Sequence, residues 1–207
     1  MTSVKEKKHN ERMKRHKEVV DNKIEQANIE QGIVLVITGN GKGKTTSALG
    51  TLLRSLGHGQ TCVLAQFIKG QWDCGETNFF ANINKESSQS GKLTTFTMDT
   101  GFTWNTQDFE KDKQAAEAIW KEILSFFSDS SCHLIVLDEL TYMFKYKYLD
   151  IKEVISAIQN RPSHQNIIIT GRGAAQELIE IADTVSEIKA IKHAFNQGIK
   201  AQKGIEW

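Results

Sequence analysis

The amino-acid sequence predicts an α/β fold in which a mostly parallel sheet carries helices on both faces. Several short runs of apolar, often β-branched residues have the length of strands. Between these runs lie stretches whose apolar residues recur at helical spacing. Strands that are almost continuously apolar are typical of parallel sheets buried between two layers of helices.

Six stretches predict the strands, in chain order. Most of these stretches are nearly all apolar, which indicates burial on both faces. The six stretches are Ile33–Thr38, Thr61–Gln66, Leu93–Met98, Leu134–Leu137, Asn166–Thr170 and Val185–Ile191, which closes the series.

Helices are expected between these strands. The first ends at Gly57, a residue type common at helix ends. The polar stretch Lys85–Lys92 predicts a surface loop, and the single proline, Pro162, falls in the turn before a strand. The expected helices are Lys44–Leu56, Gln107–Phe127, Ile151–Gln159 and Ala174–Ala182.

The composition changes sharply near Gly32, which predicts a charged amino-terminal arm over residues 1–30 and one domain over residues 31–207. The arm is mostly charged or amide-bearing, and this favours a solvated or disordered segment. A sparse apolar stripe at near-helical spacing favours a helix instead, lying on a partner subunit or over the domain's own cleft. The stripe consists of Met13, Val20, Ile24 and Ala27. Both interpretations remain open.

Charge and composition exclude several classes of protein. The formal net charge is +1, so no overall field attracts nucleic acid or an anionic membrane. No apolar run approaches the roughly 18 residues that span a bilayer, and no export signal is visible. The cysteines Cys62, Cys74 and Cys132 are odd in number and form no Cys-x-x-Cys pair. We therefore expect a cytoplasmic protein with reduced thiols and with no nucleic-acid or membrane partner.

A phosphate-binding loop lies between the first strand and the first helix. Its glycines allow backbone N–H groups to surround phosphate oxygens, and the helix start adds unpaired donors. Lys44 would neutralise the outer phosphates, and the Thr45 hydroxyl would bind Mg²⁺. The generic motif begins with Gly or Ala, where this chain has Thr38. The candidate ATP-binding residues are Gly39, Asn40, Gly41, Lys42, Gly43, Lys44, Thr45 and Thr46.

Two further stretches support a nucleotide site. The apolar strand ending at Leu137 is followed by Asp138 and Glu139, the pattern that places a carboxylate beside Mg²⁺ in P-loop proteins. The loop Gly171-Arg172-Gly173 lies directly after the strand Asn166–Thr170, at the sheet edge where ligands bind in parallel α/β folds. The Arg172 side chain would either contact a phosphate, or cap the sheet or pair with an acidic side chain.

These motifs predict a P-loop NTPase-like (RecA-like) fold that binds a polyphosphate with Mg²⁺. They leave the reaction open, because a P-loop stabilises a polyphosphate equally well as the site of attack or as the leaving group. On the motifs alone, an ATPase or a small-molecule kinase is the default interpretation.

Beyond the P-loop, the chain resembles the bacterial P-loop type of ATP:corrinoid adenosyltransferase from about residue 30 to residue 207. Thr38 and the Asn40-Gly41-Lys42 segment match that family's own form of the loop. Gly101-Phe102-Thr103-Trp104 is the most discriminating match. The other matching pieces are Gln66–Gly70, Val136–Tyr142, Ile169–Gly173, Lys192–Phe195 and Gly198–Ile205.

The resemblance implies that the Co(I) of a reduced corrinoid attacks the ribose C5′ carbon of ATP, so that triphosphate leaves and a carbon–cobalt bond forms. ATP and the reduced corrinoid are then substrates, and Mg²⁺ is the cofactor. Co(I) is already a strong nucleophile, so the protein must align and neutralise the leaving group. Lys44 is the expected catalytic cation, with Thr45 and Glu139 on the metal. Asp138 is the alternative ligand, or orients a metal-bound water.

The resemblance also assigns Phe102 and Trp104 to catalysis and corrinoid binding. They would face the corrin, displace its lower axial ligand and so ease reduction of Co(II). Residue types alone favour a structural role in the core. The family further implies a reduced flavoprotein as electron donor, and a homodimer is a possible assembly. A different class of function is a corrinoid carrier that uses ATP only as a conformational signal.

Overall fold

The structure is a computed structural model that describes residues 4–68, 74–86, 91–98 and 108–206 of the 207-residue chain. The chain divides into two compact units, Met1–Gln31 and Gly32–Trp207.

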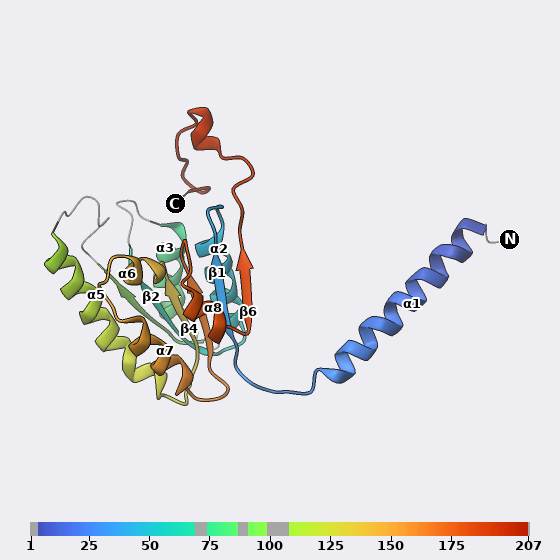
Figure 1. Cartoon of the computed structure of the whole chain (residues 1–207), viewed down its shortest axis with the longest axis horizontal. Coiled ribbons are helices and arrows are strands. Elements are labelled where there is room, and N and C mark those ends of the chain that lie inside the picture. Colours follow the sequence, from blue (N-terminus) through green and yellow to red (C-terminus); the bar gives the residue numbers. More distant parts are fainter. Residues whose placement is uncertain (1–3, 69–73, 87–90, 99–107, 207) are drawn as a thin grey trace. The chain divides into compact units, whose positions relative to one another are not determined.

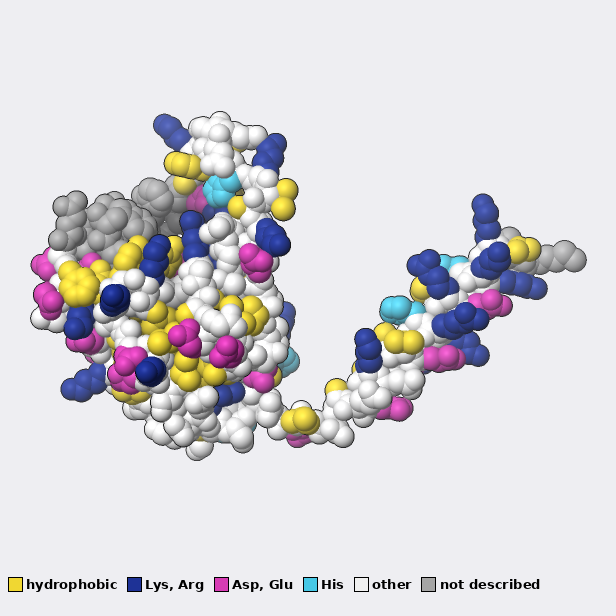
Figure 2. Space-filling view, viewed as in Figure 1, with side chains coloured by type: hydrophobic (Ala, Val, Ile, Leu, Met, Phe, Trp, Pro, Cys, Tyr) yellow, Lys and Arg dark blue, Asp and Glu magenta, His cyan; other side chains and the backbone are white. Residues whose placement is uncertain are grey.

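The first unit contains one helix, α1 (Val4–Gln26), with no buried residue. Basic and acidic side chains are interspersed along it (Figure 2). Lys17 and Asp21, one turn apart, form an exposed ion pair with 3.1 Å between nitrogen and oxygen. The apolar residues Met13 and Ile24 are 41% and 65% exposed. The arm is therefore helical in this structure, and what its apolar stripe packs against stays a prediction.

The second unit is built on a six-stranded parallel sheet in the order β3-β2-β4-β5-β1-β6 (Figure 1). Because β4 and β5 lie in the middle, their residues are almost all buried, as their apolar sequences predict. The strands are β1 (Val34–Thr38), β2 (Thr61–Gln66), β3 (Leu93–Thr97), β4 (Cys132–Asp138), β5 (Asn166–Thr170) and β6 (Thr184–Glu187).

Alternate residues of the central strands enter two separate cores. Ile135 and Leu137 pack with Trp120 and Ile123 under the helices of one face. Leu134 and Val136 pack on the other face with residues such as Leu52. The first face carries α5 (Phe109–Ile123), the 3₁₀ turn η1 (Leu124–Phe127), α6 (Thr141–Lys145), α7 (Ile151–Gln159) and α8 (Gln176–Ile181). The second face carries α2 (Lys44–Gly57) and α3 (Gly75–Glu86). This confirms the predicted α/β class with helices on both faces.

Some boundaries differ from those expected. Helix α3 was not predicted, and it takes in Lys85 and Glu86 from the stretch expected as a loop. Residues 87–90 of that stretch lie outside the described residues. The short helix α6 was also not predicted. β4 begins two residues early, at Cys132, and β6 covers Thr184–Glu187, so it ends before the expected Ile191.

Beyond β6 the chain continues as a tail that contains the 3₁₀ turn η2 (Ala194–Gln197). Figure 1 shows this tail extending past the carboxyl ends of the strands and turning back toward the amino end of α2. The tail therefore lies at the edge of the sheet where the phosphate-binding loop is found.

Candidate active site

The phosphate-binding loop joins β1 to α2 in a backbone conformation that only glycine adopts readily. Gly39 and Gly43 have φ of 99° and 107°. No side chain caps the start of α2 at Gly43, so the first N–H groups of the helix are open to a ligand. The backbone N–H of Gly41 donates to the carbonyl of Ile188 at 2.7 Å, which ties the loop to the chain after β6. The loop is thus preformed for an anion.

Lys44 lies beneath this loop and is buried, only 6% exposed. Its Nζ donates to the carbonyl of Gly41 at 2.9 Å. Burial lowers the pKa of Lys44, and the nearby carboxylates of Glu139 and Asp138 oppose that shift. An ammonium that is buried and short of hydrogen-bond partners gains stabilisation from an incoming phosphate.

Asp138 ends β4 and is held by three side-chain donors. Its Oδ1 accepts from the hydroxyls of Thr45 at 2.9 Å and Thr170 at 2.6 Å. Its Oδ2 accepts from Gln66 Nε2 at 3.5 Å. Burial raises the pKa of Asp138, and these hydrogen bonds counteract the shift. Asp138 therefore fixes the orientation of the Thr45 hydroxyl. Because the hydroxyl is the donor in this hydrogen bond, its oxygen lone pairs remain available to a cation.

Glu139 follows in the left-handed backbone region, with φ of 58°. This conformation costs a non-glycine residue roughly 1 kcal/mol and is found at functional sites. The Glu139 N–H donates to Thr170 Oγ1 at 2.9 Å, which holds the strained turn. Burial, and then the charge of Asp138, raise the pKa of Glu139 to about 7. Its Oε2 is buried without a hydrogen-bond partner, an arrangement that a bound cation would relieve.

The loop after β5 joins the same site through two threonines. The Thr141 hydroxyl donates to the carbonyl of Arg172 at 2.9 Å. The Thr38 hydroxyl accepts from the N–H of Ala174 at 3.2 Å. Thr38 therefore links two loops, which an alanine or glycine in that first motif position would not do. The Arg172 side chain is exposed, and its positive charge lowers the pKa values of both Lys44 and Glu139.

The structure thus brings the P-loop, Lys44, Thr45, Asp138 and Glu139 to one sheet edge. Phe102 and Trp104 lie outside the described residues. Sequence reasoning did not predict the hydrogen bonds by which three threonines and one glutamine hold these groups. The signal that was available for three of them, Thr38, Gln66 and Thr170, is a polar residue at the last position of an apolar strand. The four residues are Thr38, Gln66, Thr141 and Thr170.

Within the described part of the chain, no three or more His, Cys, Asp or Glu side chains gather into a metal site. A cation here would depend on the hydroxyl of Thr45 and on phosphate oxygens as well as on the acids. Nor does the described part contain a helix with the length and apolar character needed to cross a membrane.

Fold and site together define a P-loop nucleotide-binding α/β protein. The family model for ATP:corrinoid adenosyltransferase BtuR/CobO/CobP matches residues 30–207. The chain therefore belongs to the ATP:corrinoid adenosyltransferase family, an enzyme family.

Curated relatives match over nearly the whole length of the chain. The corrinoid adenosyltransferase of Escherichia coli (strain K12) is 46% identical over 202 residues, which cover 98% of this chain and 99% of the relative. Corrinoid adenosyltransferase CobA of Salmonella typhimurium is 46% identical with the same coverage. The corrinoid adenosyltransferase of Pseudomonas aeruginosa is 48% identical over 203 residues, covering 98% of this chain and 97% of the relative.

Proposed function

We propose that this enzyme transfers the 5′-deoxyadenosyl group of ATP to the Co(I) of a reduced corrinoid in cobalamin synthesis or salvage. The observation that carries the proposal is the family match over residues 30–207 in a chain whose P-loop, lysine and paired acids share one sheet edge. In this reaction the cobalt electron pair forms the bond to C5′. The bond from C5′ to the phosphate oxygen breaks, and its electrons leave with the triphosphate, so cobalt passes from Co(I) to Co(III).

The residues of this chain would act mainly on the leaving group. Lys44 and the open N–H groups at the start of α2 would stabilise the charge that develops on the departing triphosphate. Both groups are held before the substrate arrives, so little reorganisation is needed as the bond breaks. A general base is not required, because Co(I) already carries its electron pair.

Mg²⁺ is the cofactor we propose, bound by Thr45 and Glu139. Asp138 accepts hydrogen bonds on both of its oxygens, whereas Glu139 Oε2 is buried without a partner and so fits a cation directly. Asp138 would then orient the Thr45 hydroxyl rather than bind the ion. When bound, Mg²⁺ would neutralise charge on the polyphosphate.

Phe102 and Trp104 are proposed to contact the corrin and to displace its lower axial ligand. Support comes from the topology, because their segment follows β3, and β3 pairs with β2, which pairs with β4. The chain after β3 therefore leaves the same sheet edge at which β4 presents Asp138.

The partners and location in this proposal follow from the chemistry of Co(I). A reduced flavoprotein would supply the electron that converts Co(II) to Co(I). A reducing, ATP-containing compartment suits that step, so we place the enzyme in the cytoplasm. Two further proposals do not depend on this chemistry: the protein forms a homodimer, and the amino-terminal arm becomes ordered over the cleft when substrates bind.

The test is to mix the protein with ATP, Mg²⁺ and chemically reduced corrinoid and to follow the absorbance spectrum. We expect a new alkyl–cobalt spectrum that light abolishes, and a reaction that requires ATP and Mg²⁺ together. ATP consumption without any change in the corrinoid spectrum would favour an ATPase or kinase. Corrinoid binding without either change would favour a carrier.

A further inference from the structure

The two lysines of the phosphate-binding loop have different partners. Lys44 is buried and donates to a backbone carbonyl of the loop itself. Lys42 is half exposed, and its Nζ donates to Glu206 Oε2, a carboxylate 164 positions away in the carboxyl-terminal tail. The ammonium nearest the loop's outer surface is thus occupied by an acidic side chain of the same chain.

The tail that carries Glu206 is fastened at its base to the loop. After β6, the N–H of Ile188 donates to the carbonyl of Thr38 at 2.8 Å, and its carbonyl accepts from Gly41 at 2.7 Å. Close to its end the tail turns back on itself, where the Glu206 N–H donates to the carbonyl of Gln202 at 2.8 Å. Because its base is held, the tail end remains tethered to the loop when the Lys42 contact opens.

Between the tail end and the start of α2 lies a cavity of about 540 Å³. It begins beside the first helical turn after the loop and continues between α2 and α3. The tail closes one side of this space, so the end of the chain stands where an occupant of the loop would extend outward. Residues lining it include Thr45, Thr46, Leu49, Phe79, Ile205 and Glu206.

A polyphosphate in the loop and a carboxylate at Glu206 repel each other, and both attract Lys42. An exposed ion pair contributes only about 0–1 kcal/mol, so a polyphosphate can displace Glu206 at small cost. The tether raises the local concentration of the carboxylate, so Glu206 returns to Lys42 whenever the phosphate loosens. The contact therefore opposes retention of the anion without blocking its entry.

We propose that Glu206 competes with bound polyphosphate for Lys42, so that the carboxyl-terminal tail is a latch that favours release of the triphosphate product. This inference rests on the proposed function, since it takes the loop as the triphosphate site. Glu206 is a positioning residue, because it acts through Lys42 and does not touch the reacting atoms.

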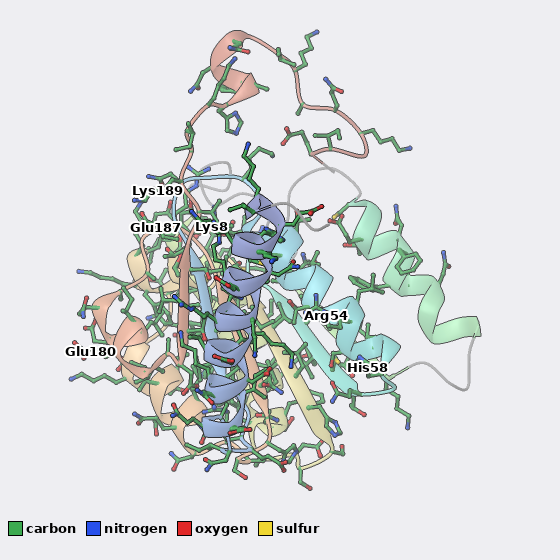
Figure 3. The ribbon with its side chains drawn as sticks, turned by 90° about the vertical axis from the view of Figure 1, so that its right-hand side faces the viewer. Lys8, Arg54, His58, Glu180, Glu187 and Lys189 are labelled. Carbon is green, nitrogen blue, oxygen red and sulfur yellow. The ribbon has the colours of Figure 1, made fainter. Side chains whose placement is uncertain are left out.

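The test measures binding of inorganic triphosphate with Mg²⁺ by calorimetry in the full-length protein. We expect Glu206→Gln to bind triphosphate about three- to fivefold more tightly, the range that an exposed ion pair permits. Lys42→Ala should bind more weakly, and adding Glu206→Gln to it should have a clearly smaller effect than in the parent, because only the direct repulsion between carboxylate and phosphate is then removed. Glu180→Gln, an exposed carboxylate on α8 away from the tail (Figure 3), is the matched control and should bind as the parent does.

Unchanged or weaker binding by Glu206→Gln would overturn the latch, as would an equal effect of that substitution with and without Lys42. These results leave the proposed function standing, provided that the parent binds triphosphate. A parent protein that binds no triphosphate would instead contradict the phosphate site, and the latch with it. Melting temperatures of all variants within a few degrees of the parent show that each is folded.

Discussion

At the scale of single residues, the site depends on charged groups that are buried with few partners. Lys44 is held by one backbone carbonyl, and Glu139 Oε2 by none. Both arrangements are unfavourable in the protein without ligands and would become favourable if a polyphosphate and a cation bind there, as we propose. Replacing either residue should therefore change both the stability of the ligand-free protein and its reaction with ligands, and each change can be measured.

Replacing Lys44 with alanine should remove about 3 kcal/mol of transition-state stabilisation, on the order of a hundredfold in kcat. The reason is that its charge matters most as the triphosphate departs. Steady-state kinetics with saturating ATP provide the measurement, and Lys152→Ala on the exposed side of α7 is the control. Turnover within a few-fold of the parent would contradict the phosphate role of Lys44.

The raised pKa of Glu139 predicts how stability changes with pH in the protein free of nucleotide and Mg²⁺. The folded state keeps the proton up to about pH 7, whereas the unfolded state loses it near pH 4.5, so the folded state binds more protons in between. Stability therefore falls as pH rises through this window, by up to about 3 kcal/mol. Glu139→Gln stays neutral and should lack this part of the decline.

Thermal or urea unfolding of the parent and of Glu139→Gln between pH 4.5 and 7 measures the difference. The pKa of Asp138 is also raised, so Asp138 contributes in the same direction in both proteins. Because its charge acts on Glu139, the difference between the two proteins includes the interaction of the two carboxyls. Parallel stability curves for the two proteins would show that Glu139 is not buried as a titrating acid.

At the scale of helices and strands, the sequence predicted those elements whose pattern is set by burial alone. β2, β5 and α7 have the expected ends. β2 and β5 are unbroken apolar runs bounded by polar residues, and the apolar residues of α7 recur at the helix period. α3 was missed because it begins at a glycine and its phenylalanines are adjacent rather than one turn apart. α6 has five residues, too few to establish a period.

The arm over residues 1–30 should contribute to corrinoid use and not to folding. The family match begins only at residue 30, and the second compact unit begins at Gly32. Truncation before Gln31 should raise the KM for the corrinoid and leave the melting temperature close to that of the parent. Kinetics at varied corrinoid concentration supply the measurement. An unchanged KM and rate would show that the arm does not contribute to corrinoid use.

The segment with Phe102 and Trp104 should act on the corrinoid and hardly on ATP, because it follows a different strand from the phosphate loop. Alanine at either position should reduce adenosylation most when Co(II) must first be reduced by a mild protein donor. The loss should be smaller with preformed Co(I), because displacement of the axial ligand is then bypassed. A paired assay of each variant gives the comparison. Equal losses in both assays with a large drop in melting temperature would place the aromatics in the core.

At the scale of the whole molecule, the parallel sheet gathers loops from distant parts of the chain at one edge. The P-loop and the paired acids could be predicted, because each is a local motif next to an apolar strand. Thr170 could not, because its role depends on β4 and β5 being neighbours, with Leu137 beside Ile169. No local motif predicts the contact of Lys42 with Glu206 either, because the two residues are 164 positions apart in the sequence.

The central claim is that ATP gives up its adenosyl group and leaves an intact triphosphate. The most direct measurement is ³¹P nuclear magnetic resonance of the phosphorus products, with ATP, Mg²⁺ and preformed Co(I) corrinoid as substrates. We predict one triphosphate for each corrinoid adenosylated, and none when the corrinoid is omitted. Diphosphate or phosphate formed in step with turnover, with no triphosphate at any time, would contradict the claim.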